Sequence, residues 1–270
     1  MSVSFLLLLF VGGILTGTLG TLLGIGGGLF LIPFLVLLFN IPMHEAIATS
    51  IIAIIATSSA GAVLNLERNL VNIRLGMSLE VASVLGAILG GITANHLSAT
   101  ILTKVFATLL LGVAGMMIYR LYHPIKDNNN PADGDMGGRY VDEATGQEVS
   151  YGVRRIGVTS FVSLLAGNVS GLLGIGGGIF KVPAMHLISG VPLKAAAATS
   201  NFMIGVTAAA SAFIYFSHGH INPFVASTAS LGVLAGSSLG VRLSKRLKGQ
   251  VVTILFVLIL VAASVQMYLK

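Results

Sequence analysis

Long apolar stretches, separated by short polar breaks, run through most of the chain. Six of them have the length of a helix that crosses the hydrocarbon core of a bilayer, which is about 30 Å thick. Residues 123–152 are the one long polar interruption. The pattern therefore predicts an all-α polytopic membrane protein, with transmembrane helices near 43–65, 76–96, 102–121, 193–216, 223–242 and 250–269.

Two further apolar stretches, 4–39 and 156–189, each contain a glycine cluster. Residues 22–28 spell LLGIGGG, and residues 172–178 repeat that motif. A continuous helix over 4–39 would measure about 54 Å, far more than one crossing needs. Because glycine permits backbone conformations that end a helix, we expect each stretch to fold back at its glycines as a re-entrant or hairpin segment.

The glycine motifs belong to a longer internal repeat. Residues 22–50 and 172–200 align without gaps and are identical at more than half of their positions, including Pro33/Pro183 and the final Thr-Ser pair. Such self-similarity is typical of transporters built from two related halves. We therefore divide the chain into a first membrane repeat (1–122), a polar connector (123–152) and a second membrane repeat (153–270).

Basic residues mark different loops in the two halves. Arg68 and Arg74 flank the loop after the helix at 43–65, whereas the matching loop at 217–222 has no Lys or Arg. In the second half the basic cluster at 242–248 marks the following loop instead. Since Lys and Arg collect on the cytoplasmic side, this switch predicts two inverted repeats, a cytoplasmic connector and termini outside the cell membrane.

Composition agrees with a membrane protein and narrows its chemistry. Apolar residues make up 55% of the chain and charged residues 9%, with a net charge of +6. All acidic residues except Glu45, Glu67 and Glu80 lie in the connector, so the membrane part is basic. The absence of cysteine excludes disulfides and thiol catalysis. The first twenty residues lack a basic leader and a cleavage site, which favours a retained membrane segment.

The connector combines a turn-rich part with a strand-like part. Arg139-Tyr140-Val141 and Val149-Ser150-Tyr151 flank a Thr145-Gly146 turn, which predicts a small β-hairpin. A lone hairpin is marginally stable, so three arrangements are open: docking on the membrane part, docking on a neighbour, or no docking.

The glycine bends are the candidate binding site. Non-helical backbone inside a bilayer must be buried or line a cavity, and the half-helix after each bend would start at mid-membrane with free N–H groups that suit an anion. The alternative is that the glycines serve close helix packing alone.

Hydroxyl and amide groups near the second helix of each half could donate hydrogen bonds to the same anion, or they could form hydrogen bonds between helices. Lys181, which has no counterpart in the first half, could balance the charge of the anion or extend to an interface. The predicted substrate-binding residues are Gly24, Gly26, Gly27, Gly28, Thr49, Ser50, Gly174, Gly176, Gly177, Gly178, Lys181, Thr199, Ser200 and Asn201.

Other polar and glycine positions suggest structural roles. The spacing of Gly86/Gly90, and of Gly232, Gly236 and Gly240, is typical of close helix packing. Glu80 could carry a coupling proton, but an interfacial cap or a partner of Arg74 is the favoured interpretation.

Enzyme signatures are incomplete. The glycine clusters lack the Gly-Lys-Ser/Thr of a phosphate loop, His44-Glu45 lacks the second histidine of a zinc motif, and His218-Gly219-His220 lacks a third ligand. We expect no catalytic residues, no metal and no cofactor.

The doubled LGIGGG motif, each copy followed by a proline and opening one half of the chain, resembles the TauE/SafE family of sulfite exporters, also called the toluene sulfonate uptake permease family. The resemblance implies a permease that exports sulfite or a related organosulfonate by alternating access. It implies a small sulfur-containing anion and membrane lipid as partners, without nucleic acid, and leaves a homo-oligomer open. An anion channel or a non-transporting membrane scaffold is the alternative.

Overall fold

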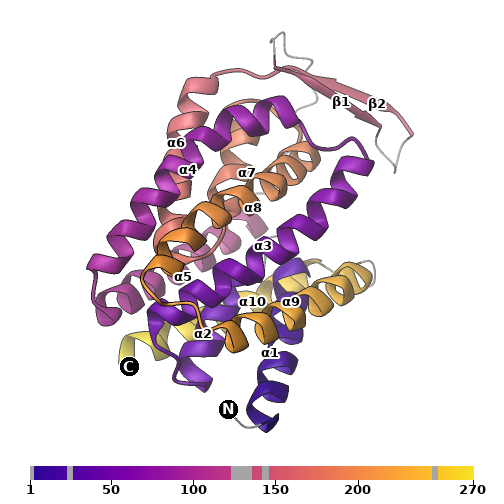
Figure 1. The fold of residues 1–270 in the computed structure, drawn as a ribbon. Helices are drawn as coiled ribbons and strands as arrows, with labels where there is room; N and C mark the ends of the chain where they lie inside the picture. The colour runs from indigo at the N-terminus through magenta and orange to yellow at the C-terminus, as the bar shows by residue number, and fades with distance from the viewer. Residues whose placement is uncertain (1–2, 23–26, 123–135, 142–145, 245–248) are drawn as a thin grey trace.

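The computed structural model describes residues 3–22, 27–122, 136–141, 146–244 and 249–270. It is a bundle of helices with one small sheet at one end (Figure 1). The elements, in chain order, are α1 (Val3–Leu22), α2 (Gly28–Leu38), α3 (Met43–Glu67), α4 (Ile73–His96), α5 (Ala99–Tyr122), β1 (Gly138–Val141), β2 (Glu148–Tyr151), α6 (Ile156–Leu173), α7 (Gly178–Leu187), α8 (Leu193–Ser217), α9 (Pro223–Ser244) and α10 (Gly249–Leu269). The predicted helices are confirmed, with ends that differ by a few residues.

Seven of the described helices are long and apolar enough to cross a membrane: α1, α3, α4, α5, α6, α8 and α9. The described apolar part of α10, Thr253–Leu269, is shorter, so the membrane crossing predicted for 250–269 stays a prediction. Their outward faces carry exposed apolar side chains such as Leu8, Phe161 and Phe213. In water such a surface would be unfavourable, whereas lipid solvates it. The chain is therefore a multi-pass membrane protein, as the hydrophobic pattern predicts.

Each glycine-broken stretch forms a long helix followed by a short one. α1 packs against α2, and α6 packs against α7, so in each half the short helix folds back on the long one. In the second half the reversal uses Gly174, Gly176 and Gly177 with φ of 64°, 81° and 69°. These left-handed conformations are costly for residues with a Cβ, which explains the glycines. The predicted fold point is confirmed at the second cluster, whereas residues 23–26 of the first cluster lie outside the described residues.

Helices from the two halves interlock. α1 packs on α9, and correspondingly α6 packs on α4, while α3 crosses α8 and α5 packs on α10. The chain begins at one end of the bundle, whereas α6 begins at the opposite end beneath the sheet (Figure 1). The α1–α9 contact of one half thus corresponds to the α6–α4 contact of the other, and the α3–α8 and α5–α10 contacts each join equivalent helices of the two halves.

The spaced glycines lie at these crossings. A Cβ at Gly86 or Gly90 of α4 would collide with the backbone of α6, and one at Gly232, Gly236 or Gly240 of α9 would collide with the backbone of α1. The predicted packing role is confirmed. α6 and α1 contribute glycines of the same spacing to these crossings, at 167/171 and 13/17.

The predicted hairpin is confirmed and is docked on the membrane part. β1 and β2 pair antiparallel, with Tyr140 opposite Val149. Tyr140 and Tyr151 are buried in one cluster with residues of α4, α7 and α8, called here the connector-end cluster: Leu75, Leu79, Tyr140, Tyr151, Val153, Met185, Val191, Ala195, Ala196 and Met203. Asn72 Nδ2 donates to Met136 O at 2.9 Å just before β1. Both chain ends lie at the opposite end of the molecule (Figure 1).

Candidate functional site

The two glycine clusters meet in the interior of the bundle. Ser50 Oγ of α3 donates to the Gly174 carbonyl at 2.7 Å. A Cβ on Gly28 would lie 2.6 Å from Ser50 Oγ and 3.0 Å from Gly174 O. Segments 146 residues apart in sequence, 28 and 174, are therefore in contact. Gly24 and Gly26 lie outside the described residues.

The short helices α2 and α7 start at this contact. The N–H of Leu31 donates to Gly27 O at 3.1 Å, and the N–H of Lys181 donates to Gly177 O at 3.1 Å. The N–H groups of Phe30 and Phe180 bond to the same two carbonyls at 3.3 and 3.2 Å, so the N–H groups without an acceptor inside the helix are those of residues 28–29 and 178–179. Because glycine has no side chain to cap them, Gly27 and Gly177 leave these donors available to a ligand. The aligned N–H groups also give each end a partial positive charge.

Two isoleucines cover the bends. Ile54 Cδ1 of α3 would lie 2.5 Å from a Cβ on Gly28, and Ile204 Cδ1 of α8 would lie 2.8 Å from one on Gly178. Ile54 and Ile204 occupy matching positions of the two halves, as do Ser50 and Ser200. Sequence reasoning missed these isoleucines, since apolar residues inside an apolar helix carry no distinguishing signal.

The predicted side-chain donors have different surroundings. Thr49 Oγ1 and Ser200 Oγ are buried, and neither has a hydrogen-bond partner in the part of the chain that the structure describes. Thr199 Oγ1 accepts from the backbone N–H of Asn72 at 2.9 Å, which is a bond between helices. Asn201 lies against Gly61 at the crossing of α3 and α8. Among the predicted site hydroxyls, Thr49 and Ser200 therefore have unused hydrogen-bonding capacity.

Lys181 lies in the first turn of α7 and is completely buried. Its Nζ donates to Thr207 Oγ1 of α8 at 2.7 Å and lies 3.5 Å from Glu80 Oε2 of α4. Thr207 Oγ1 in turn donates to Glu80 Oε1 at 2.6 Å. The prediction that Glu80 is an interfacial cap is wrong, since Glu80 is 3% exposed. Its ion pair within the described part of the chain is with Lys181 of the other half, and not with Arg74, the other predicted partner.

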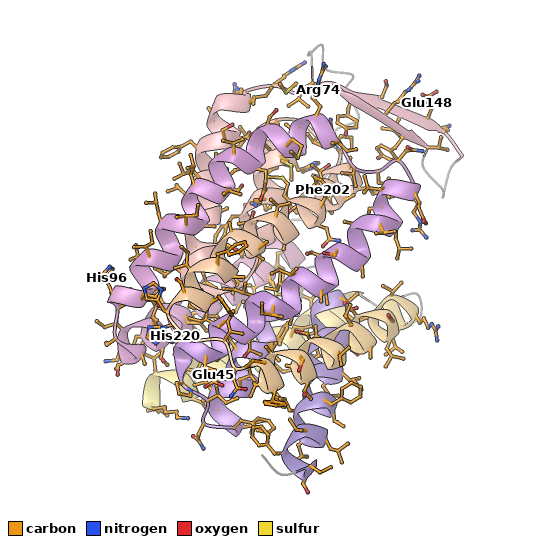
Figure 2. All side chains as sticks on the ribbon, viewed as in Figure 1. Glu45, Arg74, His96, Glu148, Phe202 and His220 are labelled. Carbon is orange, nitrogen blue, oxygen red and sulfur yellow. The ribbon has the colours of Figure 1, made fainter. Side chains whose placement is uncertain are left out.

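A cleft of about 500 Å³ opens at the end of the molecule away from the hairpin. Its lining includes His44 and Glu45 from the start of α3 and His220 from the loop between α8 and α9. Figure 2 shows Glu45 and His220 at this end and Arg74 and Glu148 at the other. The rings of His44 and His220 stack with centroids 4.9 Å apart. Partial burial, and the nearby His44 and His218, hold the pKa of His220 below its ordinary value.

Comparison with known proteins identifies the family. The family described as "Sulfite exporter TauE/SafE" matches residues 9–267, nearly the whole chain. The chain belongs to the TauE/SafE family.

Relatives of this TauE/SafE protein carry the names of transporters. "Probable membrane transporter protein YunE" of Bacillus subtilis is 25% identical over 269 residues, 96% of each chain. A "Probable membrane transporter protein" of Haemophilus influenzae is 26% identical over 286 aligned positions, 99% of each chain. "Probable membrane transporter protein MJ0441" of Methanocaldococcus jannaschii is 23% identical over 255 positions, covering 89% of this chain and 86% of that protein. No solved structure matches.

Family and relatives together make this chain a membrane transporter and not an enzyme. Within the described residues, no group of three or more potential metal ligands comes together. The arrangement offers instead groups that an anion needs: backbone N–H groups at the helix starts, two unused hydroxyls, and a buried lysine in the first turn of α7. Contact between the predicted site residues and the substrate stays a prediction.

Proposed function

We propose that this protein exports sulfite, or a related small sulfur oxyanion or organosulfonate, across the cytoplasmic membrane. The observation that carries the proposal is the contact between the two glycine bends, where Ser50 and Gly28 meet Gly174. It supports a site in which the starts of α2 and α7 lie at a similar depth inside the bundle. Half-helix ends that meet at mid-membrane are typical substrate sites of transporters.

The chemistry of the site favours a small oxyanion. An anion that leaves water for the membrane interior must regain its lost hydrogen bonds, because an unpaired buried charge costs many kcal/mol. The N–H groups at the start of α7, the hydroxyls of Thr49 and Ser200, and the charge of Lys181 would supply them. The several oxygens of sulfite would accept from donors on both halves at once.

Transport would follow alternating access between the two ends of the bundle. The connector-end cluster and the docked hairpin cover one end, while the cleft beside His44 and His220 opens at the other. We assign the covered end to the cytoplasm and the cleft and the termini to the outside, following the distribution of basic residues. In this scheme the halves 1–122 and 153–270 act as inverted repeats that rock about the glycine bends.

Substitution at the second bend tests the site. A Cβ on Gly177 would lie 2.8 Å from the Ala166 carbonyl, on a residue with φ of 69°, so Gly177→Ala should distort the start of α7. Gly112→Ala is the matched control, because a Cβ there meets nothing within 4 Å. We expect Gly177→Ala to insert into the membrane but to lose most sulfite flux from proteoliposomes, while Gly112→Ala keeps it. Full flux in Gly177→Ala would contradict a site at this bend.

A further inference from the structure

Glu80, Thr207 and Lys181 form a buried chain of polar contacts that joins the two halves. They come from α4, α8 and α7, and their side chains are almost completely hidden from solvent. Lys181 Nζ donates to Thr207 Oγ1 at 2.7 Å, and Thr207 Oγ1 donates to Glu80 Oε1 at 2.6 Å. The donors run in one direction and end on the carboxylate, as expected for an ionised glutamate that balances a charged lysine.

The chain lies between the glycine bend and the connector-end cluster. The backbone N–H of Lys181 bonds to Gly177 O, so the lysine belongs to the first turn of the half-helix at the bend. On the other side, Glu80 follows Leu79, and Thr207 Oγ1 lies 3.1 Å from the carbonyl of Met203; both Leu79 and Met203 belong to the cluster. The pair is thus one helical turn from the proposed anion site and lies beside the connector-end cluster.

Other ionisable groups on the packed elements are engaged elsewhere or lie near helix ends. On α7, His186 Nδ1 bonds to Val191 O at 2.8 Å. On α8, Tyr215 donates to Gly171 O at 3.1 Å, and Lys194 is exposed near the start of the helix. On α4 itself, Arg74 and His96 lie in the first and last turns, and α6 carries no ionisable side chain. Among the described residues, the ion pair of the Glu80 carboxylate is with Lys181.

We propose that anion and proton bind together at this site, with Glu80 as the proton acceptor. The proposal rests on the proposed function. In the empty protein the charges of Glu80 and Lys181 sum to zero, and the arrival of a monovalent anion would leave a net buried charge of −1. One proton from solution, added to the Glu80 carboxylate, restores neutrality. Lys181 then faces the anion, and the protonated acid keeps its contact with Thr207.

The reason for the coupling is the cost of uncompensated charge in a dry interior. A bound anion that draws Lys181 away from an ionised Glu80 would leave that carboxylate unpaired, which is strongly unfavourable for a buried charge. Protonation removes this cost. By linkage, the affinity for the anion should fall about tenfold per pH unit at pH values where Glu80 is ionised in the empty protein.

Calorimetric titration of the purified full chain with sulfite tests the inference. Titrations at one pH in two buffers of different ionisation enthalpy give the number of protons taken up on binding. The protonation of sulfite itself is common to all variants, so the comparison is between the wild type and Glu80→Gln. We expect about one more proton for the wild type. Glu67→Gln, an exposed carboxylate at the end of α3, should behave like the wild type.

The outcomes separate the two proposals. Equal proton numbers for the wild type and Glu80→Gln would overturn the role of Glu80, even with sulfite bound. Absence of sulfite binding to the wild type would instead overturn the proposed function. If Glu80→Gln does not fold, the wild type and Glu80→Asp are titrated with methanesulfonate, whose charge is constant over this pH range. Both should then take up about one proton, and an uptake near zero overturns the inference.

Discussion

The crossing of α4 and α6 allows a quantitative test of the packing. A Cβ at Gly90 would lie 2.9 Å from both the carbonyl carbon of Asn168 and the backbone N of Leu172, and still closer to Asn168 O. Ordinary contact begins near 3.4 Å, and backbone atoms in a helix cannot rotate away. Gly90→Ala must therefore push the two helices apart. Overpacking of this kind costs roughly 1–3 kcal/mol.

The matched control for this change is Gly112→Ala on α5, where a Cβ meets nothing within 4 Å. Both substitutions gain the same helix propensity, about 1 kcal/mol, which cancels in the comparison. We expect Gly90→Ala to be less stable than Gly112→Ala by roughly 1–3 kcal/mol in unfolding from detergent micelles. Because α4 also carries Glu80, sulfite flux should fall too. Equal stability of the two variants would refute the close α4–α6 contact.

Three further results are expected from other parts of the structure. Lys181→Met should destabilise the protein by about 3–5 kcal/mol because it leaves Glu80 buried alone, and the double variant with Glu80→Gln should recover most of that loss in a double-mutant cycle. Tyr140→Ala should undock the hairpin and speed its amide exchange, whereas Val141→Ala, at an exposed position of the same strand, should not; equal exchange would contradict docking. The depressed pKa of His220 means that the folded state binds its proton less readily than the unfolded state, so stability should drop as pH falls through about 6.5, and His220→Gln should reduce that drop in thermal unfolding between pH 7.5 and 5.

The fold was largely predictable because its signals are local or periodic. The apolar lengths indicate the helices, and the duplicated LLGIGGG motif indicates both fold points. The two Tyr-containing segments around 145–146 indicate the hairpin, but they do not tell which surface it meets. Its docking depends on apolar side chains of α4, α7 and α8, which only the folded chain brings together.

The ion pair between Glu80 and Lys181 could not be located in the same way. The two residues are 101 positions apart, in different halves, and neither has a counterpart in the repeat that would mark it. A general rule does point to them: ionisable residues inside membrane helices are costly and usually pair. Applied to one acidic and one basic residue in apolar segments, that rule favours a partner for Glu80 within the membrane over a capping role.

Counterflow of sulfite in proteoliposomes tests the central claim most directly. Vesicles containing the purified chain are loaded with unlabelled sulfite, diluted, and given labelled sulfite outside. The account predicts transient accumulation of label that saturates with concentration and depends on sulfite inside the vesicle, as expected for a carrier. Flux that is linear in concentration and indifferent to sulfite on the other side would indicate a channel, and no flux beyond that of protein-free vesicles would contradict transport of sulfite altogether.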